Sequence, residues 1–174
     1  MLDTKSLRKI AIAATTILLF LSSAAAQKRT TPRTVEKYRS PDSALVAIIT
    51  STQAPEATRE SRVEIRRKSG ELLARRNYFS EGGEQGFGVT KAVWTPDSQF
   101  FVYSLESSGG HQSWHSPVKF YGRRNSKIQS LDDALNDAVM NPDFSISAPD
   151  KVKVELWFSK KVLTVSLSSL KKRH

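Results

Sequence analysis

The sequence predicts a mainly β (all-β) protein in which antiparallel, blade-like sheets form a single open or sandwich-like domain. The main observation is a repeated pattern: a Pro-Asp turn at residues 39–43 precedes the apolar run 44–50, and a second at residues 94–98 precedes the apolar run 99–105. Proline presets the backbone angle of a tight turn, and the aspartate can accept hydrogen bonds from the backbone beyond it. A short apolar run after a turn is typical of a strand buried on both faces. Each turn is therefore expected to lead into a central strand.

A hairpin is predicted after the first run. Residues 61–68 alternate polar and apolar side chains, as a half-exposed strand does. With Ser69-Gly70 as a two-residue turn, three pairs face each other: Lys68 with Glu71, Glu64 with Arg75, and Ile65 with Ala74. The basic residues of this hairpin form either a solvated sheet face or an anion site: Arg66, Arg67, Lys68, Arg75 and Arg76.

Strands and loops continue to the end of the chain. Further strands are predicted at residues 89–94, 117–121, 127–131, 152–158 and 162–167. One short helix is predicted at residues 131–140, because Leu131, Leu135 and Val139 fall on one stripe and two aspartates stand near its start. Pro142 is expected to end this helix.

The first 26 residues predict a secretory signal peptide. A basic start is followed by an apolar stretch and by Ala24-Ala25-Ala26, a small-residue cleavage site, so the mature chain is expected to begin at Gln27. The apolar stretch is shorter than the roughly 20 residues of a membrane span. We therefore expect a periplasmic or secreted protein with no transmembrane anchor after cleavage.

The mature chain is expected to have three parts. Residues 27–39 are polar and basic and predict a flexible leader, residues 40–170 a single β-rich domain, and residues 171–174 a frayed basic tail. The sequence contains no cysteine, which excludes a disulfide framework and a lipidated cysteine.

The chain is strongly basic. Its formal net charge is +10, of which the signal segment carries a net +2. Outside the cytoplasm such a charge favours anionic lipid head groups and cell-wall polymers as partners, rather than a specific nucleic acid. The simpler alternative is that the charge only keeps the protein in solution.

Residues 94–104, Trp-Thr-Pro-Asp-Ser-Gln-Phe-Phe-Val-Tyr-Ser, resemble the Trp-Ser-Pro-Asp-Gly-Lys repeat of bacterial Tol-type β-propellers, and Ser40-Pro41-Asp42-Ser43 resembles a weaker copy. Both copies carry serine where that family usually has glycine. A third Pro-Asp pair at Pro149 has nearly the same spacing and is either a third repeat or a coincidence. The chain is too short to close a propeller alone. The resemblance implies blade-like sheets and a binding role, and it transfers no catalytic residue.

The long loops are predicted to lie together at one end of the sheets. In an antiparallel meander successive connections alternate between ends, which groups the loops 51–60, 80–88 and 106–116 opposite the Pro-Asp turns. Long, glycine-rich loops are where binding residues concentrate. The candidate binding residues on these loops are Glu84, Phe87, His111, Gln112, Trp114 and His115. Trp114 is expected either to anchor a partner or to fold back and cap the core.

The sequence favours a non-catalytic binding module, engaging a protein or an anionic envelope polymer through these loops. No motif fixes a nucleophile, a metal or a cofactor, and the sequence does not predict the oligomeric state. The alternative is a small envelope hydrolase or metal-binding protein that uses four residues of the same loops: Glu81, Glu84, His111 and His115.

Overall fold

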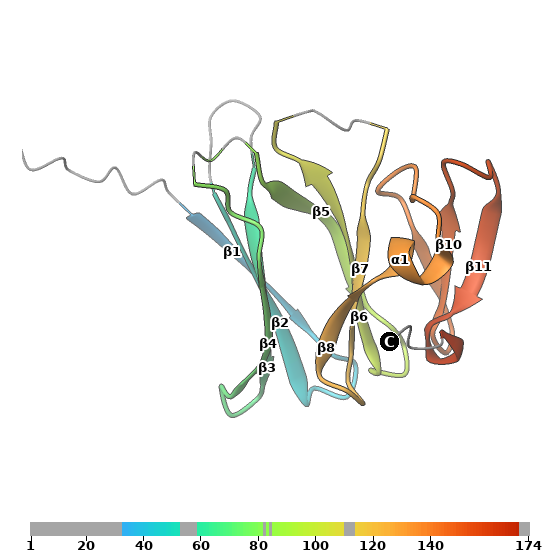
Figure 1. Ribbon diagram of the computed structural model, residues 1–174. Coiled ribbons are helices and arrows are strands. Elements are labelled where there is room, and N and C mark those ends of the chain that lie inside the picture. The colour runs from blue at the N-terminus through green and yellow to red at the C-terminus, as the bar shows by residue number, and fades with distance from the viewer. Residues whose placement is uncertain (1–32, 53–58, 82, 84, 110–113, 171–174) are drawn as a thin grey trace, which may run out of the picture. The chain divides into compact units, whose positions relative to one another are not determined.

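The computed structural model describes residues 33–52, 59–81, 83, 85–109 and 114–170. The predicted signal peptide, residues 1–26, and the predicted tail, residues 171–174, lie outside the described residues. The described chain forms three antiparallel sheets, which confirms the mainly β prediction (Figure 1). Within each sheet the strands follow one another in chain order, so each sheet is a meander.

Each sheet is formed by consecutive strands of the chain. The first sheet contains β1 (Arg33–Arg39), β2 (Leu45–Thr52), β3 (Ser61–Arg67) and β4 (Leu72–Asn77). The second contains β5 (Phe87–Trp94), β6 (Phe100–Ser107), β7 (Val118–Gly122) and β8 (Lys127–Ser130). The third contains β9 (Ser145–Ser147), β10 (Lys151–Glu155) and β11 (Val162–Ser166), and helix α1 (Leu131–Leu135) leads into it. A short 3-10 helix, Leu167–Ser169, follows β11.

The second sheet is the middle layer of three (Figure 1). Phe101 of β6 belongs to one apolar cluster, which it shares with Ile65 of the first sheet. Its neighbour Val102 points the opposite way, into a second cluster that includes Leu131 of α1 and Val152 of the third sheet. Successive side chains of a strand alternate between faces, so this one sheet supplies both cores.

The two strands that follow Pro-Asp turns differ in what covers them. β6 is buried on both faces, as predicted. In β2, Ile49 is buried against the second sheet, whereas Ile48 on the other face is only half-buried. The prediction of burial on both faces is therefore wrong for residues 44–50, because in the described structure only one face of the first sheet has a neighbouring layer.

The first Pro-Asp turn joins β1 to β2. The Asp42 carboxylate accepts hydrogen bonds from the Ser40 hydroxyl, at 2.6 Å, and from the Ala44 N–H, at 3.1 Å. Ser40 also joins the strand ends, because its hydroxyl accepts the Leu45 N–H at 3.0 Å. Ser43 completes the turn with a φ of 57°, the left-handed region that glycine occupies more readily.

The second Pro-Asp turn joins β5 to β6 with the same set of hydrogen bonds. The Asp97 carboxylate accepts from the Thr95 hydroxyl at 2.6 Å and from the Gln99 N–H at 3.0 Å, and Ser98 has a φ of 61°. The Thr95 hydroxyl accepts the Phe100 N–H at 3.0 Å, as Ser40 does for Leu45. The expected role of the aspartates is confirmed in both turns.

The third Pro-Asp pair occupies the same place in its sheet, between β9 and β10. Its hydrogen bonding is different, however. The Asp150 carboxylate accepts from the Ser166 hydroxyl at 2.8 Å and from the Ser168 N–H at 2.7 Å. Asp150 therefore fastens the end of β11 instead of bracing its own turn.

The flexible leader predicted for residues 27–39 is wrong for its described part, residues 33–39, which form β1. All seven residues of β1 pair with β2. Tyr38 anchors the strand, because its ring packs 5.7 Å from that of Phe101 and its carbonyl accepts the Trp94 indole N–H at 2.9 Å. The strand forms through backbone pairing and one aromatic contact, without an apolar run of its own.

The β3–β4 hairpin has the predicted register near its middle, where Glu64 faces Arg75 and Ile65 faces Ala74. A bulge follows, so that Arg66 faces Leu72. The predicted pairing of Lys68 with Glu71 is therefore wrong: the Arg67 N–H donates to the Glu71 carbonyl, and these two side chains form an ion pair at 2.9 Å.

The predicted helix is present but shorter than residues 131–140. It ends at Leu135, because Asn136 takes a left-handed conformation with a φ of 55°. Asparagine tolerates this conformation better than most residues, so it stops the helix well before Pro142. Within the residues that the structure describes, no helix has the length and apolar character needed to cross a membrane.

Candidate functional site

The described residues of the connections after β2, β4 and β6 lie at one end of the sheets, opposite the Pro-Asp turns (Figure 1). These residues contact one another. The Ser108 N–H donates to the Gly86 carbonyl at 2.9 Å, and the Ser108 hydroxyl donates to Glu60 at 3.0 Å. The predicted grouping of the three loops is confirmed for these residues. We call this region the loop end.

Glu60 holds the three loops together. Its side chain is buried, although Glu60 stands in a polar loop of the sequence. The carboxylate accepts four hydrogen bonds: from the Ser80 N–H (2.8 Å), the Ser80 hydroxyl (2.6 Å), the Gly86 N–H (2.6 Å) and the Ser108 hydroxyl. Burial opposes ionisation of Glu60, but these hydrogen bonds outweigh it and lower the pKa of the carboxyl. Hydrogen bonds from the protein therefore stabilise the charged form of the buried Glu60 carboxylate, as water does for an exposed carboxylate.

Gly86 of the β4–β5 loop and Gly88 at the start of β5 allow this close approach. A Cβ atom on Gly86 would lie 2.1 Å from the Tyr78 carbonyl oxygen and 2.5 Å from the Glu60 carboxyl carbon. A Cβ atom on Gly88 would lie 2.4 Å from the Arg59 carbonyl oxygen. Real Cβ atoms do not approach backbone this closely, so both positions require glycine.

His115 connects the β6–β7 loop to helix α1. Its Nε2 lies 2.8 Å from the Asp132 carboxylate. The same carboxylate accepts the N–H groups of Val118 and Val139, each at 3.0 Å. Asp132 thus fastens the start of β7 and the segment after α1, and His115 completes that arrangement.

Three aromatic side chains gather beside His115. The Trp114 ring stacks on His115 at 5.4 Å between centroids and lies 5.3 Å from Trp157 and 6.4 Å from Phe158. Trp114 is 38% exposed and Phe158 is 72% exposed. We call Trp114, Trp157 and Phe158 the aromatic platform.

Hydrogen bonds to the segment that follows α1 hold the aromatic platform in place. The Asp137 carboxylate accepts the Phe158 and Ser159 N–H groups, each at 3.0 Å, and the Trp157 N–H donates to the Ala138 carbonyl at 2.7 Å. Lys160 adds a positive charge, with its Nζ 3.6 Å from the centre of the Trp157 ring. The platform therefore presents aromatic rings on a hydrogen-bonded base, with the Lys160 cation and the Asp137 carboxylate beside them, a surface suited to partner contact.

The predicted binding residues have different positions. Trp114 and His115 belong to the platform and its support, whereas Phe87 is half-buried and packs against the core from the start of β5. Glu84, His111 and Gln112 lie outside the described residues. The Trp114 ring packs on His115, Trp157 and Phe158 and stays 38% exposed.

The alternative hydrolase or metal site uses four residues, of which the structure describes two. Glu81 is exposed, and His115 is bonded to Asp132. Among the described residues, no three His, Asp or Glu side chains gather in a way that could hold a metal ion. Nothing in the described part of the chain brings Glu81 and His115 together.

Sequence reasoning missed Glu60, Trp157 and Phe158. The last two lie at the β10–β11 connection, far along the chain from Trp114. The sequence does show two adjacent aromatic residues there, at the end of the predicted strand 152–158. Nothing in the sequence distinguishes Glu60, because a glutamate in a polar loop is common. Its role depends on contacts between three loops that are far apart in sequence.

No protein-family model matches the chain, and no curated protein and no solved structure matches it.

Proposed function

We propose that this chain is a secreted or periplasmic, non-catalytic binding module that engages a protein or an anionic envelope component through its loop end. The aromatic platform is the observation that carries the proposal. Large aromatic side chains supply much of the binding energy at interfaces, and rigid ones lose little entropy on binding. Trp114 and Phe158 meet both conditions, because they are exposed and stand on a hydrogen-bonded base.

The charge of the chain supports an anionic partner. The formal net charge is +10, and Lys160 stands at the platform itself. A basic protein attracts anionic polymers over distances of about 10 Å at moderate salt. The signal segment would deliver the chain to the compartment in which such polymers occur. The resemblance to propeller repeats agrees with a binding role.

Retention on defined envelope fractions tests the proposal. The mature chain is immobilised and exposed to an envelope protein extract, and separately mixed with purified insoluble cell-wall glycan and sedimented. We expect Trp114→Ala and Phe158→Ala to lose retention in one of the two assays at an unchanged melting temperature. Val35→Ala is the matched control, since Val35 is 56% exposed on β1, outside the loop end. Full retention by both platform variants in both assays would contradict the proposal.

A further inference from the structure

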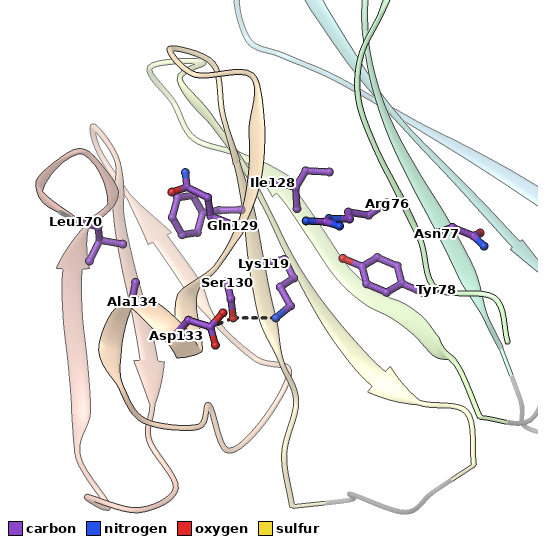
Figure 2. A pocket seen from close by; sticks show the side chains of 11 residues that line it. Arg76, Asn77, Tyr78, Lys119, Ile128, Gln129, Ser130, Asp133, Ala134 and Leu170 are labelled. Carbon is purple, nitrogen blue, oxygen red and sulfur yellow. Dashed lines mark hydrogen bonds between the residues drawn. The ribbon is translucent and has the colours of Figure 1, made fainter. Parts of the chain in front are cut away.

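A second site lies away from the loop-end platform, in a cleft between β4 of the first sheet and β8 of the second (Figure 2). The cleft has a volume of about 540 Å³. Its polar lining comes from β4, β7, β8 and α1 and includes Arg76, Tyr78, Lys119, Gln129, Ser130 and Asp133. Phe120 and Ile128 supply apolar walls.

Two cations face this cleft. Arg76 pairs with Val63 across the hairpin, which places it on the inner face of the first sheet, and Figure 2 shows its guanidinium directed towards β8. Lys119 reaches into the cleft from β7 and donates to the Ser130 hydroxyl at 2.8 Å. Among the described residues, neither cation has a carboxylate oxygen within 4.0 Å.

The neighbouring arginine shows the contrast. Arg75 lies on the opposite face of the same strand, where it contacts the Glu64 carboxylate at 2.9 Å. Two adjacent arginines of β4 therefore have different surroundings: Arg75 contacts a carboxylate on the outer face of the first sheet, and Arg76 projects its charge into a cleft. Arg75 is for this reason a matched control for Arg76.

A hydroxyl group adds a hydrogen-bonding position. The Tyr78 and Tyr103 hydroxyls are 2.8 Å apart, and Figure 2 shows the Tyr78 hydroxyl directed into the cleft beside Arg76 and Lys119. Burial raises the pKa of Tyr78, and the nearby Arg76 charge acts in the opposite direction. The tyrosine therefore stays neutral and can donate a hydrogen bond.

We infer that the cleft binds a phosphomonoester group, with Arg76 and Lys119 supplying the charge and Tyr78 a hydrogen bond. A phosphomonoester carries close to two negative charges at neutral pH, which matches two cations, whereas one carboxylate matches only one of them. The guanidinium fork fits two phosphate oxygens at once, and the lysine acts as a point charge. Asp133 also lines the cleft, and its negative charge opposes the ligand, so it limits the affinity. The inference does not depend on the aromatic platform.

Calorimetric titration of the mature chain with glycerol 1-phosphate tests the inference. We expect saturable binding at constant ionic strength, weakened about tenfold or more by Arg76→Gln and by Lys119→Gln. Arg75→Gln should bind within about twofold of the unchanged chain, because its charge lies on the other face of the sheet. Asp133→Asn should bind more tightly, a gain that a purely structural role for these residues does not explain.

Further measurements distinguish specific binding of a phosphomonoester from general attraction of anions. Binding should weaken at pH 5, where the phosphomonoester loses part of its negative charge. Acetate at the same concentration should bind far more weakly. A phosphomonoester could come from a lipid head group or from a free ester. Pelleting with vesicles that contain phosphatidic acid distinguishes these two sources, because a lipid-linked ester pellets the protein and a free ester does not.

If Arg76→Gln does not fold, the Lys119→Gln and Asp133→Asn variants test the inference. Absence of saturable binding, or equal losses in Arg75→Gln and Arg76→Gln, would overturn the inference.

Discussion

The backbone N–H of Asp42 donates a hydrogen bond to the Ser98 hydroxyl at 3.0 Å, which joins the two Pro-Asp turns directly. A second contact reinforces the first, since Arg123 forms an ion pair with the Asp42 carboxylate. Two turns that are far apart in sequence thus brace the same end of the first two sheets. Ser98 is buried in this contact, whereas Ser43, its counterpart in the first turn, is exposed.

The first prediction follows from that difference. Ser43→Gly should stabilise the protein by about 0.5 kcal/mol, because glycine occupies a positive φ without strain. Ser98→Gly should instead destabilise it by about 1 kcal/mol, because the Asp42 N–H loses its acceptor in a partly buried position. Urea unfolding of both variants measures the two effects. Stabilisation by both variants would show that the Asp42–Ser98 hydrogen bond does not stabilise the turns.

Replacing Glu60 should loosen the loop end. Glu60→Gln places an amide group among hydrogen-bond donors, so we expect a loss of about 1 to 3 kcal/mol in the free energy of unfolding. Hydrogen exchange of the Ser80 and Gly86 amides should accelerate at the same time. Glu81→Gln is the control, since Glu81 is an exposed residue of the same loop. Equal stability of the two variants would contradict the central role of Glu60.

Glu60 should contribute to the pH dependence of the free energy of unfolding in the acid range. Its pKa in the folded chain lies below the ordinary value of 4.5. The charged carboxylate therefore contributes stability above the unfolded pKa, and this contribution is lost as the pH falls through the folded pKa. Urea unfolding between pH 7 and pH 3 should show a smaller pH dependence for Glu60→Gln than for the unchanged chain. Identical slopes would show that Glu60 does not titrate differently on folding.

Glu64 is another position at which a single substitution should change the stability. Its carboxylate contacts Arg66 at 2.8 Å, Arg75 at 2.9 Å and Arg62 at 3.4 Å, and its side chain is only 9% exposed. Glu64→Gln leaves three positive charges together, so we expect a loss of about 2 to 4 kcal/mol. Glu71→Gln removes an exposed ion pair with Arg67 and should cost about 0.5 kcal/mol or less. Chemical denaturation distinguishes these outcomes, and similar losses for the two variants would contradict this account.

The last prediction concerns the core between the first two sheets. Phe101 is fully buried, and its ring contacts those of Tyr38, Trp94 and Tyr103. Phe101→Ala should destabilise the protein by about 3 to 5 kcal/mol. Phe158→Ala provides the comparison, because that ring is exposed and its loss should leave the melting temperature nearly unchanged. A Phe101→Ala variant with the melting temperature of the unchanged chain would refute the core assignment.

The turns and paired strands could be predicted from the sequence because their causes are local. The Pro-Asp pairs and the alternation in β3 act over a few residues, and the structure confirms the Glu64–Arg75 register. β1 could not be predicted, since its side chains are mostly polar and it is stabilised by the backbone of β2. The short helix shows the same limit, because the conformation of Asn136 overrides the apolar stripe that suggested a longer one.

The candidate sites depend on contacts between residues that are far apart in the sequence. Trp114 could be selected from its glycine-rich loop, but its partners Trp157 and Phe158 come from another sheet. Arg76 could be assigned only to a basic cluster with two possible roles. The structure separates it from Arg75 by placing the two side chains on opposite faces of β4.

The middle position of the second sheet has a consequence for how the chain folds. Each sheet is a meander of neighbouring strands, so its contacts are local in sequence and can form early. The second sheet is different, because it carries apolar side chains on both faces and needs two partners before they are covered. An intermediate in which only the first two sheets have docked still exposes Val102 and Phe120. We expect this intermediate to be the species most prone to aggregation during refolding, because that apolar face of the sheet stays exposed until the third sheet docks.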